Sequence, residues 1–324
     1  MGNRKALVVG IDDYPICPLK GCCNDSEAIK DLLSNHGNGD PNFEVWKKDN
    51  VATKGELREL IEKCFEGDAD VALFYYSGHG HIDKVGGYLV TPDFSNHDYG
   101  VSLQDVLSIA NESKCKERII ILDSCYSGFM GSISTSGQNT AVINEGVTIM
   151  TASRDSQTSA EIDGHGVFTA LLMEALKGGA ADVTGHISIA GIYAFIDKAL
   201  GPWDQRPVFK TNVNSFISLR DVKPQVDVSV LRKLTTYFSS EKDLYQLNPS
   251  FEPTNNPEVE HTIKEPYANN ENTAIFSDLQ KLEGIGLVVP EGEEHMYYAA
   301  MNSKLCKLTP IGKRYWKLVK EGRI

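Results

Sequence analysis

Two short segments, each at the end of an apolar run, carry residues that could together cleave an amide bond. The first run, Ile119–Leu122, shows no polar alternation, which is typical of a strand buried on both faces of a parallel sheet, and Asp-Ser-Cys follows it at residues 123–125. Ligands of an open parallel sheet bind beyond the carboxyl ends of its strands. This position favours Cys125 as a nucleophile. A buried structural cysteine is the competing interpretation, because free cysteine is among the most buried residue types.

The second segment supplies a histidine. Val71–Tyr76 is another apolar, β-prone run, and it ends in Ser-Gly-His-Gly-His at residues 77–81. A cysteine nucleophile needs a base that generates the thiolate and an acid that protonates the leaving amine, and histidine can do both near neutral pH. The glycines on both sides of His79 allow a sharp turn that leaves the ring uncovered. His79 is therefore the predicted partner of Cys125. His81 is the competing histidine, and a capped loop histidine is the other interpretation of His79.

At these residues the chain resembles a known family. Ser-Gly-His-Gly followed by Asp-Ser-Cys-Tyr-Ser-Gly resembles the caspase-like cysteine peptidases of clan CD (peptidase C14), and the nearest branch is the metacaspases with their bacterial relatives, the orthocaspases. The Gln-Ala-Cys motif of animal caspases is absent, but the histidine precedes the cysteine by about 50 residues, as in caspases. Residues 19–25 resemble the metacaspase motif after the first strand, and residues 151–161 resemble the start of the small-subunit region. The resemblance covers roughly residues 4–220.

The resemblance implies a mechanism. Cys125 attacks the peptide carbonyl and forms a thioester, while His79 protonates the departing amine and later activates water. The tetrahedral oxyanion needs hydrogen-bond donors, and the family places them at the backbone N–H groups of Gly80 and Cys125.

The resemblance also implies a substrate pocket. Four residues match the pocket positions of metacaspases: Asp25, Asp123, Ser77 and Cys22. Two carboxylates in a partly dry pocket should select arginine or lysine through charge-assisted hydrogen bonds. For Asp25 a first-turn carboxylate, stabilised by the helix dipole, is a further interpretation, and both can hold.

No metal or other cofactor is expected. Many metacaspases need calcium, but here only Asp93 matches a ligand position, and a hard cation wants several oxygen ligands. No cysteine and histidine spacing suggests zinc.

The alternation of strand and helix patterns predicts the architecture that positions these residues. We expect an α/β, caspase-like three-layer sandwich with a mainly parallel sheet of about six strands and helices on both faces. Asn24 and Thr53 are the expected caps of the first two helices. The predicted strands are residues 5–10, 43–46, 71–76, 119–122, 146–152, 207–209 and 216–219, the last two closing the sheet.

The end of the chain has a different pattern. A helix at 272–282, a strand at 286–290 that pairs with 296–300, and a helix at 309–319 resemble a winged-helix domain. The predicted division is a peptidase domain at 1–220 (large-subunit-like 1–128, linker 129–145, small-subunit-like 146–220), a connecting helix and Pro-rich loop at 221–270, and a winged-helix-like α+β domain at 271–324.

Composition bounds the partners and the compartment. The chain has 324 residues, 41% of them hydrophobic, and a formal net charge of -12, which disfavours nucleic acid and anionic membranes without excluding nucleic acid. We expect no membrane segment and no signal peptide, and seven cysteines without a regular framework suit a reducing, cytoplasmic location. The basic last stretch can be a solvated helix face, and a winged helix could also contact DNA. Glu291, Glu293 and Glu294 on the expected wing would oppose phosphate, so a regulatory protein partner is favoured.

The sequence therefore predicts a cysteine endopeptidase that cuts proteins after arginine or lysine and is regulated or recruited through its C-terminal domain. The alternative is a caspase-like interaction or signalling protein with weak or no proteolysis. The intact pair of Cys125 and His79 disfavours the alternative.

Overall fold

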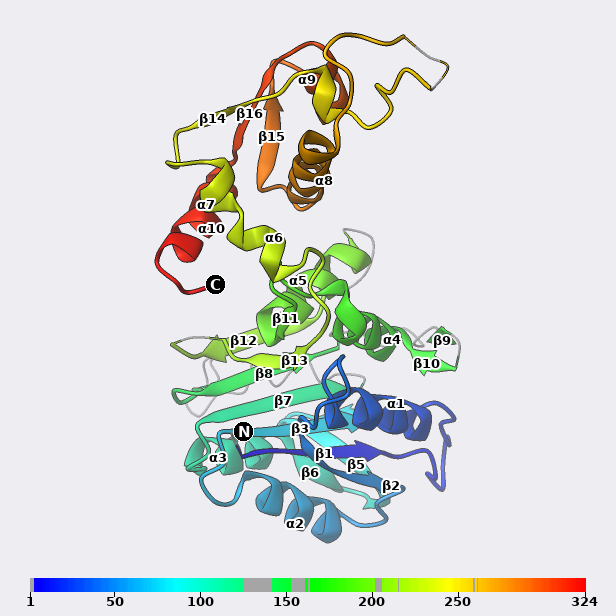
Figure 1. The fold of residues 1–324 in the computed structure, drawn as a ribbon. Helices are drawn as coiled ribbons and strands as arrows, with labels where there is room; N and C mark the ends of the chain where they lie inside the picture. The colour runs from blue at the N-terminus through cyan, green and yellow to red at the C-terminus, as the bar shows by residue number, and fades with distance from the viewer. Residues whose placement is uncertain are drawn as a thin grey trace. The chain divides into compact units, whose positions relative to one another are not determined.

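The chain divides into two units, Met1–Lys223 and Pro224–Ile324, in the computed structural model (Figure 1). The structure describes residues 3–124, 142–152, 161–162 (backbone only), 164–201, 206–214, 216–258, 260 and 262–324.

The first unit is built on one six-stranded sheet, with strands in the order β12-β8-β7-β3-β1-β2. All neighbouring strands run parallel except β12, which is antiparallel to β8 at the edge. The prediction of a mainly parallel six-stranded sheet is confirmed. The strands are β1 (Arg4–Gly10), β2 (Glu44–Asp49), β3 (Val71–Ser77), β7 (Glu117–Asp123), β8 (Val147–Thr151) and β12 (Val208–Asn212).

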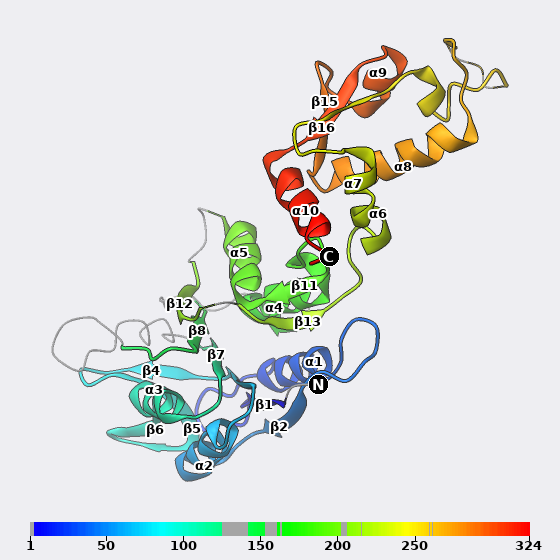
Figure 2. The same cartoon turned by 60° about the vertical axis from the view of Figure 1, so that its left-hand side comes forward.

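Helices cover both faces of this sheet, which confirms the three-layer prediction (Figure 2). One face packs on α2 (Lys54–Phe65) and α3 (Leu103–Glu112), and the other packs on α1 (Cys22–Ser34), α4 (Val167–Glu174) and α5 (Ile189–Leu200). Successive side chains of a strand point to opposite faces. Leu7 and Val9 of β1 accordingly belong to the hydrophobic core on the side of α2 and α3. Ala6 and Val8 belong to the core on the side of α1, α4 and α5. The inner strands are buried on both faces, and this is why the sequences of β1, β3, β7 and β8 show apolar runs without polar alternation.

Three small sheets surround the large one. The first consists of β4 (Gly80–Ile82), β5 (Gly87–Ser95) and β6 (Asp98–Ser102). The second pairs β9 (Glu161–Ile162) with β10 (His165–Gly166), and the third pairs β11 (His186–Ser188) with β13 (Ser218–Asp221).

Residues 216–219 therefore do not close the central sheet, and that part of the prediction was wrong. Only Leu219 of β13 is buried. One buried side chain suffices for a two-stranded ribbon, but a central strand of this sheet is buried along its whole length.

The start of α1 also differs from the prediction. The helix begins at Cys22, and Asn24 lies inside it instead of capping it. The cap comes from the loop after β1, where the carboxylate of Asp12 accepts hydrogen bonds from the N–H groups of Cys22 and Cys23 at 2.9 and 3.1 Å. A cap ten residues away leaves no local sequence pattern. By contrast, the predicted cap of α2 is confirmed, because Thr53 accepts a hydrogen bond from the Glu56 N–H group.

The second unit contains a three-stranded antiparallel sheet in the order β14-β16-β15. Its elements are α6 (Val228–Arg232), α7 (Leu234–Tyr237), β14 (Leu244–Gln246), the 3-10 turn η3 (Pro249–Phe251), α8 (Asn270–Gly284), β15 (Val288–Glu291), α9 (Met296–Met301), β16 (Leu305–Leu308) and α10 (Pro310–Lys320).

The predicted strand at 296–300 was wrong, because these residues form helix α9. Met296, Ala299 and Ala300 are buried, and this i, i+3, i+4 spacing is helical. The strand that pairs with β15 is β16, which follows α9 in the sequence.

Residues 224–270, predicted as a connecting segment, lie in the second unit and add the strand β14 to its sheet. Much of the Pro-rich loop is held by one side chain. The Asn255 amide is fully buried, and it donates to the carbonyls of Pro249, Lys264 and Pro266 and accepts from the Lys264 N–H group.

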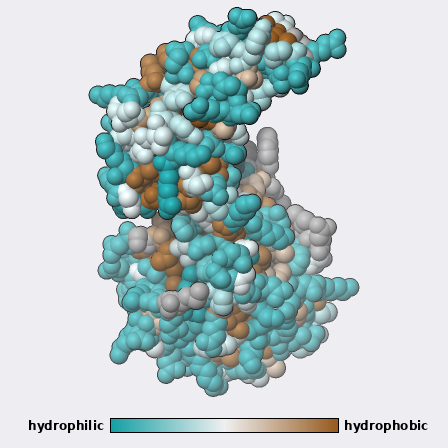
Figure 3. All heavy atoms as spheres, in the orientation of Figure 1, coloured by the Kyte–Doolittle hydropathy of each residue, from teal (hydrophilic) through white to brown (hydrophobic). Residues whose placement is uncertain are grey.

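Hydrophilic residues cover most of the face shown in Figure 3, with hydrophobic residues in small groups between them. Within the described part of the chain, no helix combines the length and the apolarity needed to cross a bilayer.

The fragment 1–223 should fold by itself, because every strand of the large sheet precedes Lys223. Cutting at residue 217 should be harmful, since β13 binds the start of β1 and the end of α1. Arg4 donates to the Ser218 carbonyl at 2.6 Å, and the Gly37 N–H group donates to the Asp221 carbonyl at 2.6 Å. In urea unfolding followed by circular dichroism, 1–223 should unfold cooperatively, and 1–217 should be about 2 kcal/mol or more less stable. Equal stability of the two fragments would contradict this account of β13.

Candidate functional site

The parallel register of the central strands brings the predicted site residues together. Ser77, the last residue of β3, pairs with Gly10 of β1 on one side and with Asp123 of β7 on the other. The Gly78 N–H group donates to the Asp123 carbonyl at 3.3 Å, so the two strands stay side by side where they end. His79 follows Ser77 by two residues, as Cys125 follows Asp123. Cys125 lies outside the described residues, which reach Ser124 on this side.

His79 is held by a backbone carbonyl. Its Nε2 atom lies 2.7 Å from the carbonyl oxygen of Cys17. A carbonyl oxygen only accepts, so Nε2 carries the proton, and Nδ1 is the nitrogen that can take up a proton or deliver one. Cys17 has a left-handed backbone with φ of 58°. That conformation is uncommon for a residue other than glycine, and it belongs to the loop that aims this carbonyl at the histidine.

Two tyrosine hydroxyls fix the backbone around His79. The His79 N–H group donates to the Tyr14 hydroxyl at 3.0 Å, and the Tyr76 hydroxyl donates to the His79 carbonyl at 3.0 Å. The Tyr14 ring packs against the imidazole with centroids 4.5 Å apart. Burial raises the pKa of both tyrosines, so both stay neutral and keep their donor hydrogens. A Cβ on Gly78 would lie 2.6 Å from the Tyr76 hydroxyl oxygen, which explains why glycine precedes the histidine.

The predicted pocket residues Asp25, Ser77 and Cys22 lie together beneath this edge. Asp25, in the first turn of α1, is only 2% exposed. Its Oδ2 atom accepts a hydrogen bond from the Ser77 hydroxyl at 3.0 Å, and its Oδ1 atom is 2.8 Å from Nδ1 of His165. Burial raises the pKa of the Asp25 carboxyl, and the hydrogen bonds from His165 and Ser77 oppose that rise.

Asp123, the other predicted pocket carboxylate, has a different set of partners. Thr169 of α4 donates to its Oδ2 atom at 2.6 Å, and the buried Tyr75 hydroxyl lies 2.6 Å from the Thr169 oxygen. Because Thr169 has a single hydroxyl hydrogen, Tyr75 must donate to Thr169. Burial raises the pKa of Asp123 to about 6, with a further rise from the negative charge of Asp25. The site thus holds two carboxylates that influence each other.

Four other cysteines, of which Cys23 is half-buried and the rest are buried, are poor nucleophiles. Burial raises the pKa of Cys22 far above its ordinary value, and it raises the pKa of Cys23, Cys64 and Cys306 to about 12. These thiols stay protonated at neutral pH, so they are structural groups.

Sequence reasoning missed three neighbours of the site: His165, Thr169 and Tyr14. His165 stands in a second Gly-His-Gly, at residues 164–166, which repeats the pattern around His79. A Cβ on Gly166 would lie 2.9 Å from Asp123 Oδ2, so this glycine, too, is required by a close approach. The repeated Gly-His-Gly was the available signal, whereas nothing local marked Thr169 or Tyr14.

The remaining predicted residues are placed less fully. Gly80 begins β4, which starts the small sheet beside His79. Asp93 accepts hydrogen bonds from the Lys54 N–H group and from the Thr91 hydroxyl, so its carboxylate serves the start of α2. In the described ranges, no three His, Cys, Asp or Glu side chains converge to hold a metal ion.

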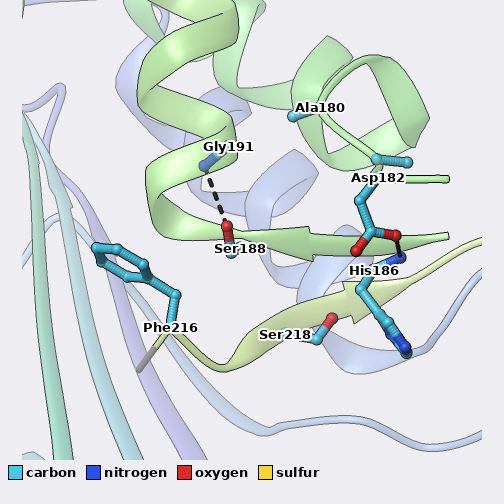
Figure 4. A pocket seen from close by; sticks show the side chains of 8 residues that line it. Ala180, Asp182, His186, Ser188, Gly191, Phe216 and Ser218 are labelled. Carbon is cyan, nitrogen blue, oxygen red and sulfur yellow. Dashed lines mark hydrogen bonds between the residues drawn. The ribbon is translucent and has the colours of Figure 1, made fainter. Parts of the chain in front are cut away.

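A separate hollow of about 520 Å³ lies beside β11 and β13 (Figure 4). His186 and Asp182 are on its wall, where the His186 N–H group donates to Asp182 at 3.0 Å. None of the predicted site residues lines this hollow.

Comparison with known proteins shows relatives among plant metacaspases. The chain is 31% identical to Metacaspase-9 of Arabidopsis thaliana over 147 residues, which cover 39% of this chain and 44% of the relative. It is 27% identical to Metacaspase-1 of the same plant over 150 residues, covering 39% and 40%. The aligned region thus spans less than half the length of either relative.

The fold has a counterpart among solved structures. The crystal structure of Caspase-1 from Spodoptera frugiperda covers 68% of this chain and 91% of its own, with a TM-score of 0.51 at 16% identity. This likeness confirms the predicted caspase-like fold. Residues 3–215 match the Caspase domain, Peptidase C14, as a whole. The matched range holds β1 to β12 and the whole of the site described above, and the chain therefore belongs to the caspase-domain family of peptidases.

Proposed function

We propose that this chain is a cysteine endopeptidase in which Cys125 is the nucleophile and His79 the acid and base. The observation that carries this proposal is the pairing of Ser77 with Asp123, because it sets the His79 segment beside the strand that leads to Cys125. The Cys17 carbonyl accepts a hydrogen bond from Nε2 of His79, so Nδ1 is the ring nitrogen that remains available for proton transfer.

The proposed reaction has two halves. His79 Nδ1 accepts the proton of the Cys125 thiol, and the sulfur attacks the peptide carbonyl carbon while backbone N–H groups, assigned to Gly80 and Cys125, stabilise the oxyanion. The carbon–nitrogen bond breaks as His79 Nδ1 gives its proton to the amine, which leaves a thioester. Water then attacks the thioester, His79 Nδ1 accepts a proton from it, and the carboxylic acid and the thiol are released.

We propose further that the side chain before the cut is arginine or lysine. Asp25 and Asp123 offer two carboxylates, and Ser77 and Cys22 offer neutral surface. A basic side chain relieves the electrostatic cost of two buried carboxylates, whereas an aspartate side chain would increase it.

The C-terminal unit is proposed to regulate or recruit the peptidase by binding a protein. Two of the basic side chains that suggested nucleic acid are paired with acids: Lys307 with Glu291 at 3.0 Å and Lys317 with Glu241 at 2.8 Å. Meanwhile Tyr297 and Tyr298 on α9 are exposed. Exposed tyrosines favour a protein partner, and paired lysines weaken attraction to phosphate. The three-stranded sheet with the order β14-β16-β15 and its flanking helices support the predicted likeness to a winged helix.

The dyad and the pocket are tested with peptides that differ only in the residue before the cut. The wild type should cut after arginine and lysine and leave the aspartate and leucine peptides intact. Cys125→Ala and His79→Ala should each lower kcat by about a thousandfold or more. When catalytic residues act as a unit, removing any one of them abolishes almost all of the rate acceleration that they supply together. His81→Ala is the matched control and should stay active. Retained activity in Cys125→Ala, or cleavage after aspartate, would refute the proposal, and complete inactivity of the wild type would favour the interaction protein.

The role of the Cys17 carbonyl predicts an unusual pair of variants. Cys17→Gly keeps the carbonyl and suits a φ of 58°, so kcat should stay within about twofold of the wild type. Cys17→Val also keeps the carbonyl, but a β-branched side chain disfavours that φ, so the loop should shift and kcat should fall by about tenfold or more. Steady-state kinetics on an arginine peptide check both. A large loss in Cys17→Gly would show that the thiol matters, against this proposal.

Asp123→Asn should separate stability from function. The folded pKa of about 6 lies above the ordinary value of 3.8, so the stability that protonated Asp123 contributes is present below about pH 4 and lost as the pH rises through 6. Asparagine avoids this loss. At pH 8 the variant should be more stable than the wild type by about 1–3 kcal/mol in urea unfolding, and the difference should shrink toward pH 4. Its kcat/KM for arginine peptides should nevertheless fall by about tenfold or more. Lower stability at pH 8 would mean that the carboxylate is not electrostatically strained.

A further inference from the structure

The inner carboxylate of the pocket is already occupied by a residue of the chain itself. His165 Nδ1 lies 2.8 Å from Asp25 Oδ1, while Ser77 holds Asp25 Oδ2. Solvent reaches the His165 side chain, which is 21% exposed, but it barely reaches Asp25, which is 2% exposed. A basic side chain that enters from solvent can therefore contact Asp25 Oδ1 only after the imidazole has moved.

We propose that His165 is a specificity-determining residue of the pocket, an internal occupant of Asp25 that the arginine or lysine of the substrate displaces. The inference rests on the proposed peptidase function and on its preference for basic side chains. It adds a competitor to the site, since the imidazole and a guanidinium or ammonium group are all N–H donors that pair with the same carboxylate oxygen.

The local structure suits a residue that moves. His165 belongs to β10, which has two residues and pairs only with the two residues of β9. Its side chain is half-buried, so a change of rotamer does not require the repacking of a core. Asp25 is different, because it sits in the first turn of α1 with Ser77 bonded to it, and it stays in place.

The charges around His165 decide whether its removal strengthens or weakens the binding of a basic substrate side chain. Asp25 faces it from α1, and Asp123, on β7, adds the second negative charge of the pocket. Thr169 of α4 and Ser77 of β3 are neutral. His165 stands on Asp25 Oδ1 and occupies the position that a basic side chain of the substrate would take. Its removal should strengthen substrate binding, which is the opposite of what damage to the site would do.

The experiment compares His165→Ala and His165→Asn with the wild type on an arginine peptide at pH 8, where Asp123 is ionised. In His165→Ala the KM should fall by about two- to fivefold, the range that one partly exposed contact to a carboxylate supplies, with kcat unchanged. In His165→Asn the amide nitrogen stands near the position of Nδ1 and keeps a neutral donor on Asp25, so its KM should lie between the other two. This second variant decides the question if His165→Ala does not give a cooperative thermal melt.

Two controls separate competition from other effects. His186→Ala removes a histidine that is also paired with an aspartate, Asp221 at 2.7 Å, but lies at the other hollow, and it should leave KM unchanged. In the Asp25→Ala background, His165→Ala should have no effect on KM, because the competition needs the carboxylate.

The inference is overturned if His165→Ala and His165→Asn fold normally and show an unchanged or raised KM, or if the gain persists without Asp25. A wild type that cuts neither arginine nor lysine peptides is a different result, and it would overturn the proposed function itself.

Discussion

The position of Ser77 between Gly10 and Asp123 is the constraint on which the rest of the site depends. Parallel pairing over the whole length of β3 brings the three strand ends level. A slip of one residue would exchange the faces of β3 and put its core side chains on the wrong side. The two hydrophobic cores, which bury both faces of the sheet, thus fix the register, and the register in turn fixes where His79 and the pocket carboxylates lie.

The pocket shows how that frame allows a costly arrangement. Tyr75 and Tyr76 are adjacent in β3, so their hydroxyls serve opposite faces of the sheet. Tyr75 donates to Thr169, which donates to Asp123, and Tyr76 supports the His79 backbone. Burial keeps both phenols neutral, so each keeps its donor hydrogen, and the Tyr76 hydroxyl lies within hydrogen-bond distance of both the His79 and the Val90 carbonyls. Without the Thr169 hydroxyl, Asp123 would lose the hydrogen bond that partly offsets its burial. The same strand therefore supports both the His79 backbone, through Tyr76, and the Asp123 carboxylate, through Tyr75 and Thr169.

The sequence allowed the central sheet to be predicted because its apolar runs are long, unbroken and followed by glycine or polar residues. It also indicated His79 and Asp123 as neighbours, since the ends of parallel strands meet at one edge, whereas Asp25, Ser77 and Cys22 were indicated only by the resemblance to metacaspases. It failed where a short segment has two possible partners. Residues 216–219 formed a ribbon with β11, and residues 296–300 formed α9, because few buried side chains decide such cases. It also failed where the partner is distant in sequence, as Asp12 is from the start of α1 and Thr169 is from Asp123.

The Cys17 carbonyl has a consequence for how such a site can change over evolution. Every amino acid carries a backbone carbonyl, so no single side chain encodes the group that orients His79. What encodes it is the path of the loop between β1 and α1, which is fixed by hydrogen bonds from the Tyr14 and Leu19 N–H groups to the Asp12 carbonyl. Point substitutions leave the group present, whereas a gain or loss of one residue between Asp12 and Gly21 would displace it. Selection on the orientation of His79 should therefore act on loop length and backbone conformation, and residue identity at position 17 is free to drift within the limits that a left-handed backbone sets.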